Sequence, residues 1–65
     1  MTVVIRMRDG RETRLDRGLR LDQVAIKVNN ARLHGQLVQF ELDLTPTGQM
    51  IWVDPAEVVS IRDDR

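Results

Sequence analysis

The chain has 65 residues, no cysteine, and ten acidic and ten basic side chains. It is long enough for one domain, which at this size buries only about 60% of the surface that its unfolded chain exposes. Without cysteine, disulfide bonds and thiolate zinc sites are excluded as supplements to so small a core. We therefore expect stabilisation by association, either as a homo-oligomer or with another protein.

The apolar segments are short, and the N-terminus lacks the apolar run of a signal peptide. We expect a protein that starts at Met1, is cytoplasmic and has no membrane partner. With 42% hydrophobic and 31% charged residues, the composition is typical of an ordered globular domain.

The charges are unevenly distributed along the chain. Residues 1–34 carry eight basic and four acidic side chains, a net charge of +4. Residues 35–65 carry two basic and six acidic side chains, a net charge of −4. This asymmetry predicts complementary contacts inside the molecule, contacts between copies, or a basic face for an anionic partner.

The N-terminal residues 2–8 alternate apolar and basic side chains, which predicts a strand, and Asp9-Gly10 then signals a hairpin. A three-residue loop, Arg8-Asp9-Gly10, pairs Ile5 with Thr13 and keeps the apolar side chains on one face. A two-residue loop would mix apolar and charged groups on that face. We therefore predict the longer loop, with Gly10 in the left-handed conformation, and a second strand over residues 11–16.

Residues 17–20 read as a loop, and two structures compete for residues 22–33. Every second residue is β-branched at Val24, Ile26 and Val28, which predicts a strand. The same stretch also has helical spacing, with Asp22 as a cap and an end near Gly35. Because Ile26 would lie off the apolar face of such a helix, we prefer the strand, followed by a turn at Asn29-Asn30.

The clearest strand pattern lies in residues 37–44. Its inward side chains are Val38, Phe40, Leu42 and Leu44, which alternate with polar residues. The Pro- and Gly-containing turn over residues 45–49 joins this strand to a second one, Met50–Val53, as another hairpin.

Residues 54–57 combine a capping Asp, a Pro at the first helical position and a Glu at the third, which predicts a one-turn helix near Pro55–Glu57. Residues 58–61 then resume as a strand, and a helix over residues 55–63 is the alternative. The single domain is expected to end at residue 62, and residues 63–65 are expected to fray.

About six short strands with tight turns predict a mostly β fold. A small antiparallel barrel or a strongly bent sheet, SH3-like or Sm-like in size, suits this pattern because closure removes exposed strand edges. The alternative is an α+β fold with a helix at about residues 22–33.

The candidate catalytic residues are isolated. His34 is the only histidine, Ser60 lacks the glycine elbow of a nucleophile, and the carboxylates are scattered. A general base needs an orienting partner and a substrate site beside it. We therefore expect no enzyme activity, no cofactor, no metal site and no small-molecule substrate.

Four arginines of the first hairpin are candidate contacts for nucleic acid or another anionic partner: Arg6, Arg8, Arg11 and Arg14. Basic strands of a small barrel can follow a phosphate backbone. Such surfaces normally include aromatic stacking platforms, and here Phe40 and Trp52 belong to apolar segments. Nucleic-acid binding is therefore the second hypothesis.

The strand Met50–Val53 is apolar at all four positions, whereas a half-exposed strand alternates with polar residues. Both of its faces therefore need a cover. The second cover is either the loop 17–21 or a partner, and we prefer a partner because Trp and Met are enriched at interfaces. Leu37 could join the same patch.

The leading hypothesis is a non-enzymatic protein-interaction or assembly module that self-associates through Trp52, Met50 and Leu37. A short chain of this kind fits a small regulator, an adaptor or an accessory protein of a phage or mobile element, a suggestion that rests on size alone.

Overall fold

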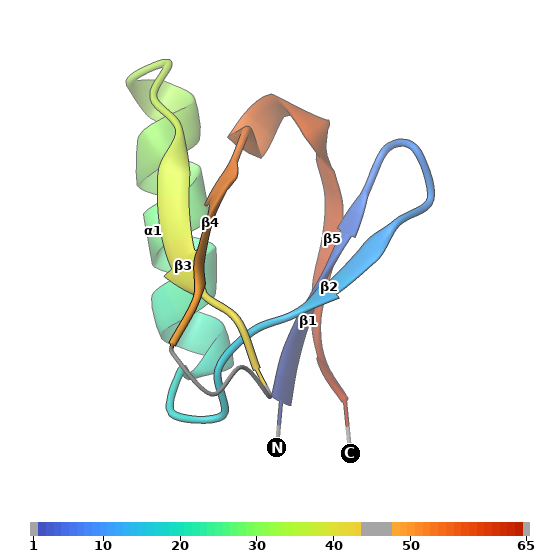
Figure 1. Cartoon of the computed structure of the whole chain (residues 1–65). Coiled ribbons are helices and arrows are strands. Elements are labelled where there is room, and N and C mark those ends of the chain that lie inside the picture. The colour runs from blue at the N-terminus through green and yellow to red at the C-terminus, as the bar shows by residue number, and fades with distance from the viewer. Residues whose placement is uncertain (1, 44–47, 65) are drawn as a thin grey trace.

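The computed structural model describes residues 2–43 and 48–64 (Figure 1). The elements in this part of the chain are β1 (Thr2–Met7), β2 (Glu12–Arg14), α1 (Leu21–Leu33), β3 (Val38–Glu41), β4 (Met50–Val53), the 3-10 helix η1 (Pro55–Glu57) and β5 (Val58–Asp64). The strands form two antiparallel sheets, β2-β1-β5 and β3-β4. The fold is therefore mostly β with one α-helix, and the strands described do not close into a barrel.

The first hairpin has the predicted register. Ile5 lies opposite Thr13, and the Met7 amide donates to the Arg11 carbonyl over 2.8 Å, which leaves a three-residue loop. Gly10 has a φ of +92°, a value that a residue with a Cβ adopts only with strain. Regular pairing in β2 stops at Arg14, earlier than the predicted strand end at residue 16.

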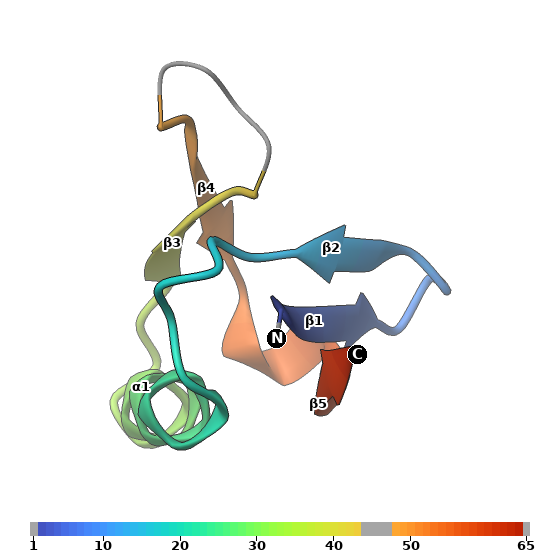
Figure 2. The same cartoon turned by 90° about the horizontal axis from the view of Figure 1, so that it is seen from below.

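The two sheets join at the end of β2. Leu15 forms a bridge with Leu42, the Asp16 amide donates to the Glu41 carbonyl over 2.8 Å, and the Asp43 amide donates to the Arg14 carbonyl over 3.2 Å. The strands therefore follow one another in the order β4-β3-β2-β1-β5. Figure 2 shows that the β3–β4 hairpin is turned steeply away from the other three strands.

Residues 21–33 form helix α1, so the preferred strand over residues 24–28 and the turn at Asn29-Asn30 were wrong. The alternative helix was right, although Arg20 and not Asp22 is the capping residue. The helix buries Val24, Val28 and Ala31. Ile26 lies off that apolar face, as expected, and remains 61% exposed. Burying the stripe outweighs the β-branched residues' weak preference for a strand.

The C-terminal end of α1 has a Schellman motif. The Gln36 amide donates to the Ala31 carbonyl over 2.9 Å and the Gly35 amide donates to the Arg32 carbonyl over 3.4 Å. Gly35 has the positive φ, +62°, that this motif requires. The motif ends the helix and directs the chain into β3.

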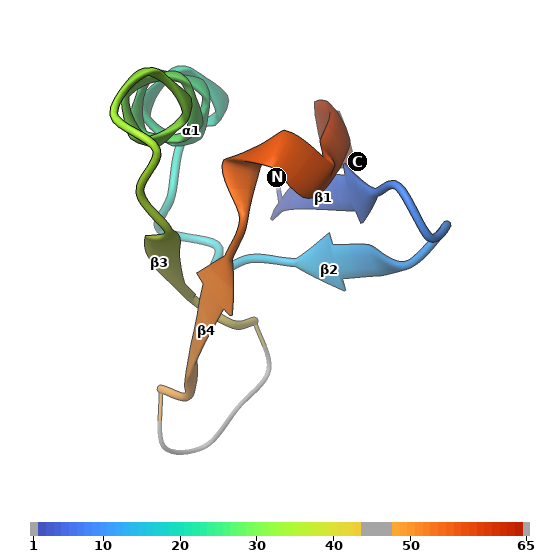
Figure 3. The same ribbon diagram turned by 90° about the horizontal axis from the view of Figure 1, so that it is seen from above.

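The core lies between the bent sheet and α1, which contacts β3, η1 and β5. Its buried residues are Val3, Ile5, Leu15, Val24, Val28, Ala31, Val38, Phe40 and Val53. The Arg32 guanidinium also donates to the Pro55 carbonyl over 3.1 Å, which ties the end of α1 to η1. Figure 3 shows the chain crossing through η1 from β4 to β5.

The C-terminal segment has the predicted short helix and a longer strand than predicted. The Asp54 carboxylate accepts from the Ala56 amide over 3.0 Å at the start of η1. The alternative helix over residues 55–63 is wrong, because β5 pairs with β1 as far as Asp64, opposite Thr2. Residues 63 and 64, which we expected to fray, are thus strand residues. Leu44, most of the 45–49 turn and Arg65 lie outside the described residues. Within the two described ranges, no helix is long and apolar enough to cross a membrane.

Candidate protein-interaction site

The register of the β3–β4 hairpin sorts its side chains into two faces. Val53 lies opposite Val38, and Ile51 lies opposite Phe40, on the side of the core. Alternation places the remaining side chains on the other side. We call this side the outer hairpin face; it consists of Leu37, Gln39, Glu41, Met50 and Trp52, with Trp52 opposite Gln39 and Met50 opposite Glu41.

The structure brings together the three residues proposed from the sequence as an interface. Trp52 is 66% exposed, Leu37 56% and Met50 45%, whereas Val53 on the inner side is only 4% exposed. The loop 17–21 therefore does not cover Trp52. Leu19 of this loop packs against the core instead. The second face of β4 is apolar and uncovered.

The arginines proposed as anionic contacts do not share one surface. Arg6 and Arg14 lie on the outer face of the β2-β1-β5 sheet, whereas Arg11 lies beside the loop and pairs with Asp9 at 2.8 Å. Arg8 follows the end of β1, where its backbone amide donates to the Glu57 carbonyl.

Acidic residues are interleaved with the basic ones on the outer face of that sheet. Arg14 pairs with Asp64 at 2.6 Å, and Arg62 pairs with Glu12 at 2.7 Å. Both pairs join β2 to β5 across β1, one on each side of Val4, which is only 1% exposed. Both pairs connect the two ends of the sequence, but only Arg14–Asp64 joins a basic residue of the N-terminal half to an acidic residue of the C-terminal half.

The Glu12–Arg62 pair should make stability depend on pH. The hydrogen bond from Arg62, followed by its positive charge, lowers the pKa of Glu12 below its ordinary value of 4.5. A lowered pKa contributes stability that is fully present above the unfolded value and is lost as the pH falls through the folded value. We expect the Glu12→Gln variant to lose less thermal stability than the wild type as the pH falls below 4.5.

Circular dichroism melts over a pH series measure this difference. Glu57→Gln is the control, because Glu57 has no side-chain ion pair among the residues described. It should keep the wild-type pH dependence. An identical pH dependence for Glu12→Gln and the wild type would show that the pair does not couple protonation to folding.

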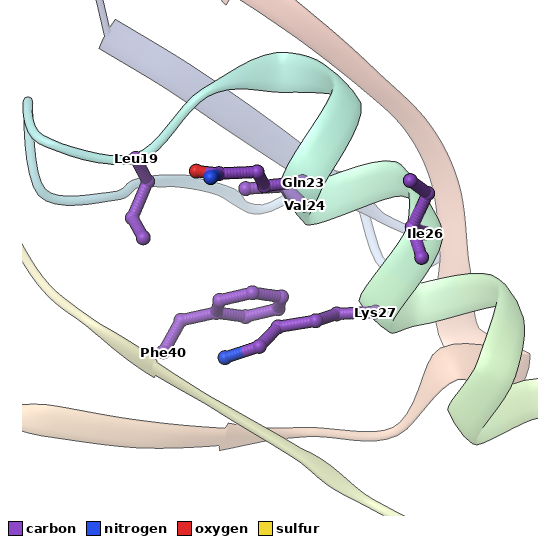
Figure 4. A pocket seen from close by; sticks show the side chains of 6 residues that line it. All are labelled: Leu19, Gln23, Val24, Ile26, Lys27 and Phe40. Carbon is purple, nitrogen blue, oxygen red and sulfur yellow. The ribbon is translucent and has the colours of Figure 1, made fainter.

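A second surface feature is a hollow of about 380 Å³ between α1 and β3. Figure 4 shows the side chains that line it: Leu19, Gln23, Val24, Ile26, Lys27 and Phe40. The Lys27 ammonium lies 5.8 Å from the centre of the Phe40 ring, a cation–π distance. The strand preferred for residues 24–28 gave no indication of this hollow, whereas the helical spacing of Gln23 and Lys27 could have indicated it.

The isolated polar residues have structural surroundings. The His34 Nδ1 atom lies 2.7 Å from the Asn30 carbonyl at the end of α1. Ser60 lies opposite Arg6 in the β1–β5 ladder. Among residues 2–43 and 48–64, no three His, Asp or Glu side chains gather as a possible metal site.

No family model matches the chain, and neither a curated protein nor a solved structure matches it.

Proposed function

We propose that this protein is a non-enzymatic protein-interaction module that assembles with a second copy of itself through the outer hairpin face. The observation that carries the proposal is the exposure of Trp52 beside Leu37 and Met50 on one sheet face. Trp is among the residues that contribute most to binding energy at interfaces, and Met is also enriched there.

The gain from covering Trp52 alone is substantial. An aromatic side chain buries roughly 150–250 Å², so the exposed two thirds of Trp52 correspond to on the order of 100–170 Å². At about 25 cal/mol per Å², covering this surface contributes roughly 3–4 kcal/mol. A 65-residue chain has a total folding stability of only about 3–10 kcal/mol. The gross gain from covering Trp52 is therefore large beside the stability of the core, and it offsets part of the roughly 4–15 kcal/mol that association costs in lost freedom of motion.

The distribution of charges favours the outer hairpin face over the outer face of the β2-β1-β5 sheet as the contact surface. On the outer hairpin face, Glu41 is the only charged side chain, so two copies meet there with little charge to desolvate. On the outer face of the other sheet, two ion pairs already satisfy four of the charged groups. The binding of nucleic acid through the first hairpin has less support, because Arg11 and Arg14 are paired with carboxylates.

The strand order supports the proposal that the fold is a half-open barrel. In the order β4-β3-β2-β1-β5, with η1 between β4 and β5, closure would require only that the terminal strands meet. The molecule is on this proposal a half-open barrel of SH3-like or Sm-like size, and it acts in the cytoplasm as a small regulator, adaptor or accessory protein.

Trp52 provides its own probe, because it is the only Trp in a chain without Tyr. Its fluorescence should shift to shorter wavelength, and its quenching by iodide should fall, as the protein concentration is raised. Light scattering on the same samples should show an increase in mass. Emission typical of exposed Trp and a single-chain mass throughout the range would overturn the proposal.

A further inference from the structure

The outer edge of β4 carries backbone groups that face away from its sheet. The Leu42 amide donates to the Gln49 carbonyl over 2.8 Å, which identifies this opposed pair as hydrogen-bonded. Along an antiparallel ladder, hydrogen-bonded pairs alternate with non-hydrogen-bonded pairs. The backbone groups of Ile51 and Val53 therefore also bond to β3, whereas the N–H and C=O groups of Met50 and Trp52 point to the other edge of β4. Within the part of the chain described, β4 has no strand partner on that edge.

This edge is less protected than the other terminal strand edge, that of β5. Proteins usually guard an open edge with charged residues or Pro. The terminal strand β5 does carry charges, namely Arg62, Asp63 and Asp64. Residues 48–53, in contrast, contain neither a charge nor a Pro. A hollow of about 310 Å³ lies between residues 51–53 of β4 and the first hairpin.

We propose that two copies pair through these edges, β4 against the partner's β4, antiparallel about a two-fold axis at Ile51. This inference rests on the proposed self-association and specifies its geometry: the two outer hairpin faces lie side by side, and each Trp52 is covered from its side by the partner copy and not by a stacked face. Each Met50 then lies opposite the partner's Trp52, and the two hairpins become one four-stranded antiparallel sheet. The occupant of the edge is therefore a second copy of this chain.

The backbone geometry restricts the register. The outward N–H and C=O groups of one β4 must point toward those of the other. Residue 50 or 52 of one copy therefore has to lie opposite residue 50 or 52 of its partner. Of the three registers that allow this, only the one centred on Ile51 gives both residues a partner within β4. It also brings the Met50 thioether beside the partner's indole, a favourable contact, and keeps the two Glu41 side chains on opposite flanks of the joint sheet.

A cysteine placed on the axis tests this geometry directly, because the natural chain has none. In the proposed dimer, residue 51 faces its own copy in a non-hydrogen-bonded pair, with a Cα separation of about 4.5 Å. This separation lies inside the roughly 4.4–6.8 Å range that a disulfide requires. Under mild oxidation, Ile51→Cys should form disulfide dimers at least about tenfold faster than the control Val59→Cys, whose residue is exposed on β5.

A second pair of variants separates backbone pairing from side-chain contact. Met50→Pro and Met50→Ala both remove the thioether, but only Pro removes the outward N–H, and Pro is tolerated where the strand edge faces solvent. Circular dichroism should show that both fold. We expect Met50→Pro to weaken association at least about tenfold more than Met50→Ala, since it also removes hydrogen bonds across the axis.

The outcomes distinguish edge pairing from the proposed self-association on which it rests. A wild type that stays monomeric would refute both. A wild type that dimerises, with equal crosslinking of the two Cys variants and equal weakening by Pro and Ala at Met50, would refute the edge pairing alone. That result would indicate instead that the outer hairpin faces stack on each other or on a different protein. Preferential crosslinking at residue 51 supports the two-fold geometry.

Discussion

Trp52→Ala should raise the dissociation constant of the self-associated protein by about 30-fold or more. Central interface residues of this type contribute 2 kcal/mol or more, and each 1.4 kcal/mol corresponds to a factor of ten. Because the Trp52 side chain is 66% exposed in the single chain, the same change should alter the free energy of unfolding of the monomer only slightly. Sedimentation measurements give the first quantity, and urea denaturation at low protein concentration gives the second.

Val59→Ala is the matched control for this experiment, because Val59 is 59% exposed but lies on β5, in the other sheet. It should leave the dissociation constant unchanged. If Val59→Ala and Trp52→Ala weakened association equally, the contact would not be specific to the outer hairpin face. If Trp52→Ala weakened folding as much as association, Trp52 would be a core residue.

Phe40→Ala should remove a large part of the protein's folding stability. Phe40 is the largest of the fully buried side chains and lies where β3 faces α1 and Leu19. Replacing a buried Phe by Ala costs about 3–5 kcal/mol. This cost is comparable to the roughly 3–10 kcal/mol expected for a domain of this length. The fraction folded, measured by far-ultraviolet circular dichroism, is the readout.

Two variants bracket the expected loss. Phe40→Leu keeps most of the side-chain volume and should remain largely folded. Leu33→Ala removes an apolar side chain that is 73% exposed at the end of α1, and should change the free energy of unfolding by no more than about 0.5 kcal/mol. A Phe40→Ala variant with wild-type stability would mean that the core does not depend on the contact between β3 and α1.

The elements that could be predicted from the sequence are those that local chemistry determines. The register of the first hairpin follows from Gly10 and from the need to keep Ile5 on the apolar face, and the structure has that register. The start of η1 follows from Asp54 and Pro55 in the same way. In both places, a turn residue and the neighbouring side-chain pattern favour the same structure.

Helix α1 was harder to predict because its apolar residues fit both the two-residue period of a strand and the 3.6-residue period of a helix. The β-branched residues at 24, 26 and 28 suit a strand, and the stripe at 24, 28 and 31 suits a helix. The choice depends on what the stripe meets in space, namely β3, η1 and β5. The turn chemistry of Gly35, seen as a C-terminal helix signal, was the local feature that favoured the helix most.

The candidate site was more accessible to sequence reasoning than the charged surface. Four consecutive apolar residues in a short strand imply that one face needs an external cover, and the structure leaves Met50 and Trp52 on such a face. The pairing of Arg62 with Glu12, in contrast, joins residues that are 50 positions apart. No local pattern could indicate that contact, so the hairpin arginines looked more available than they are.

Sedimentation equilibrium of the wild-type chain over a wide concentration range tests the central claim most directly. Self-association through the outer hairpin face predicts a mass that rises from that of one chain toward that of two as the concentration increases. It also predicts that Trp52 fluorescence shifts over the same range. A single-chain mass up to the highest soluble concentration would contradict the account.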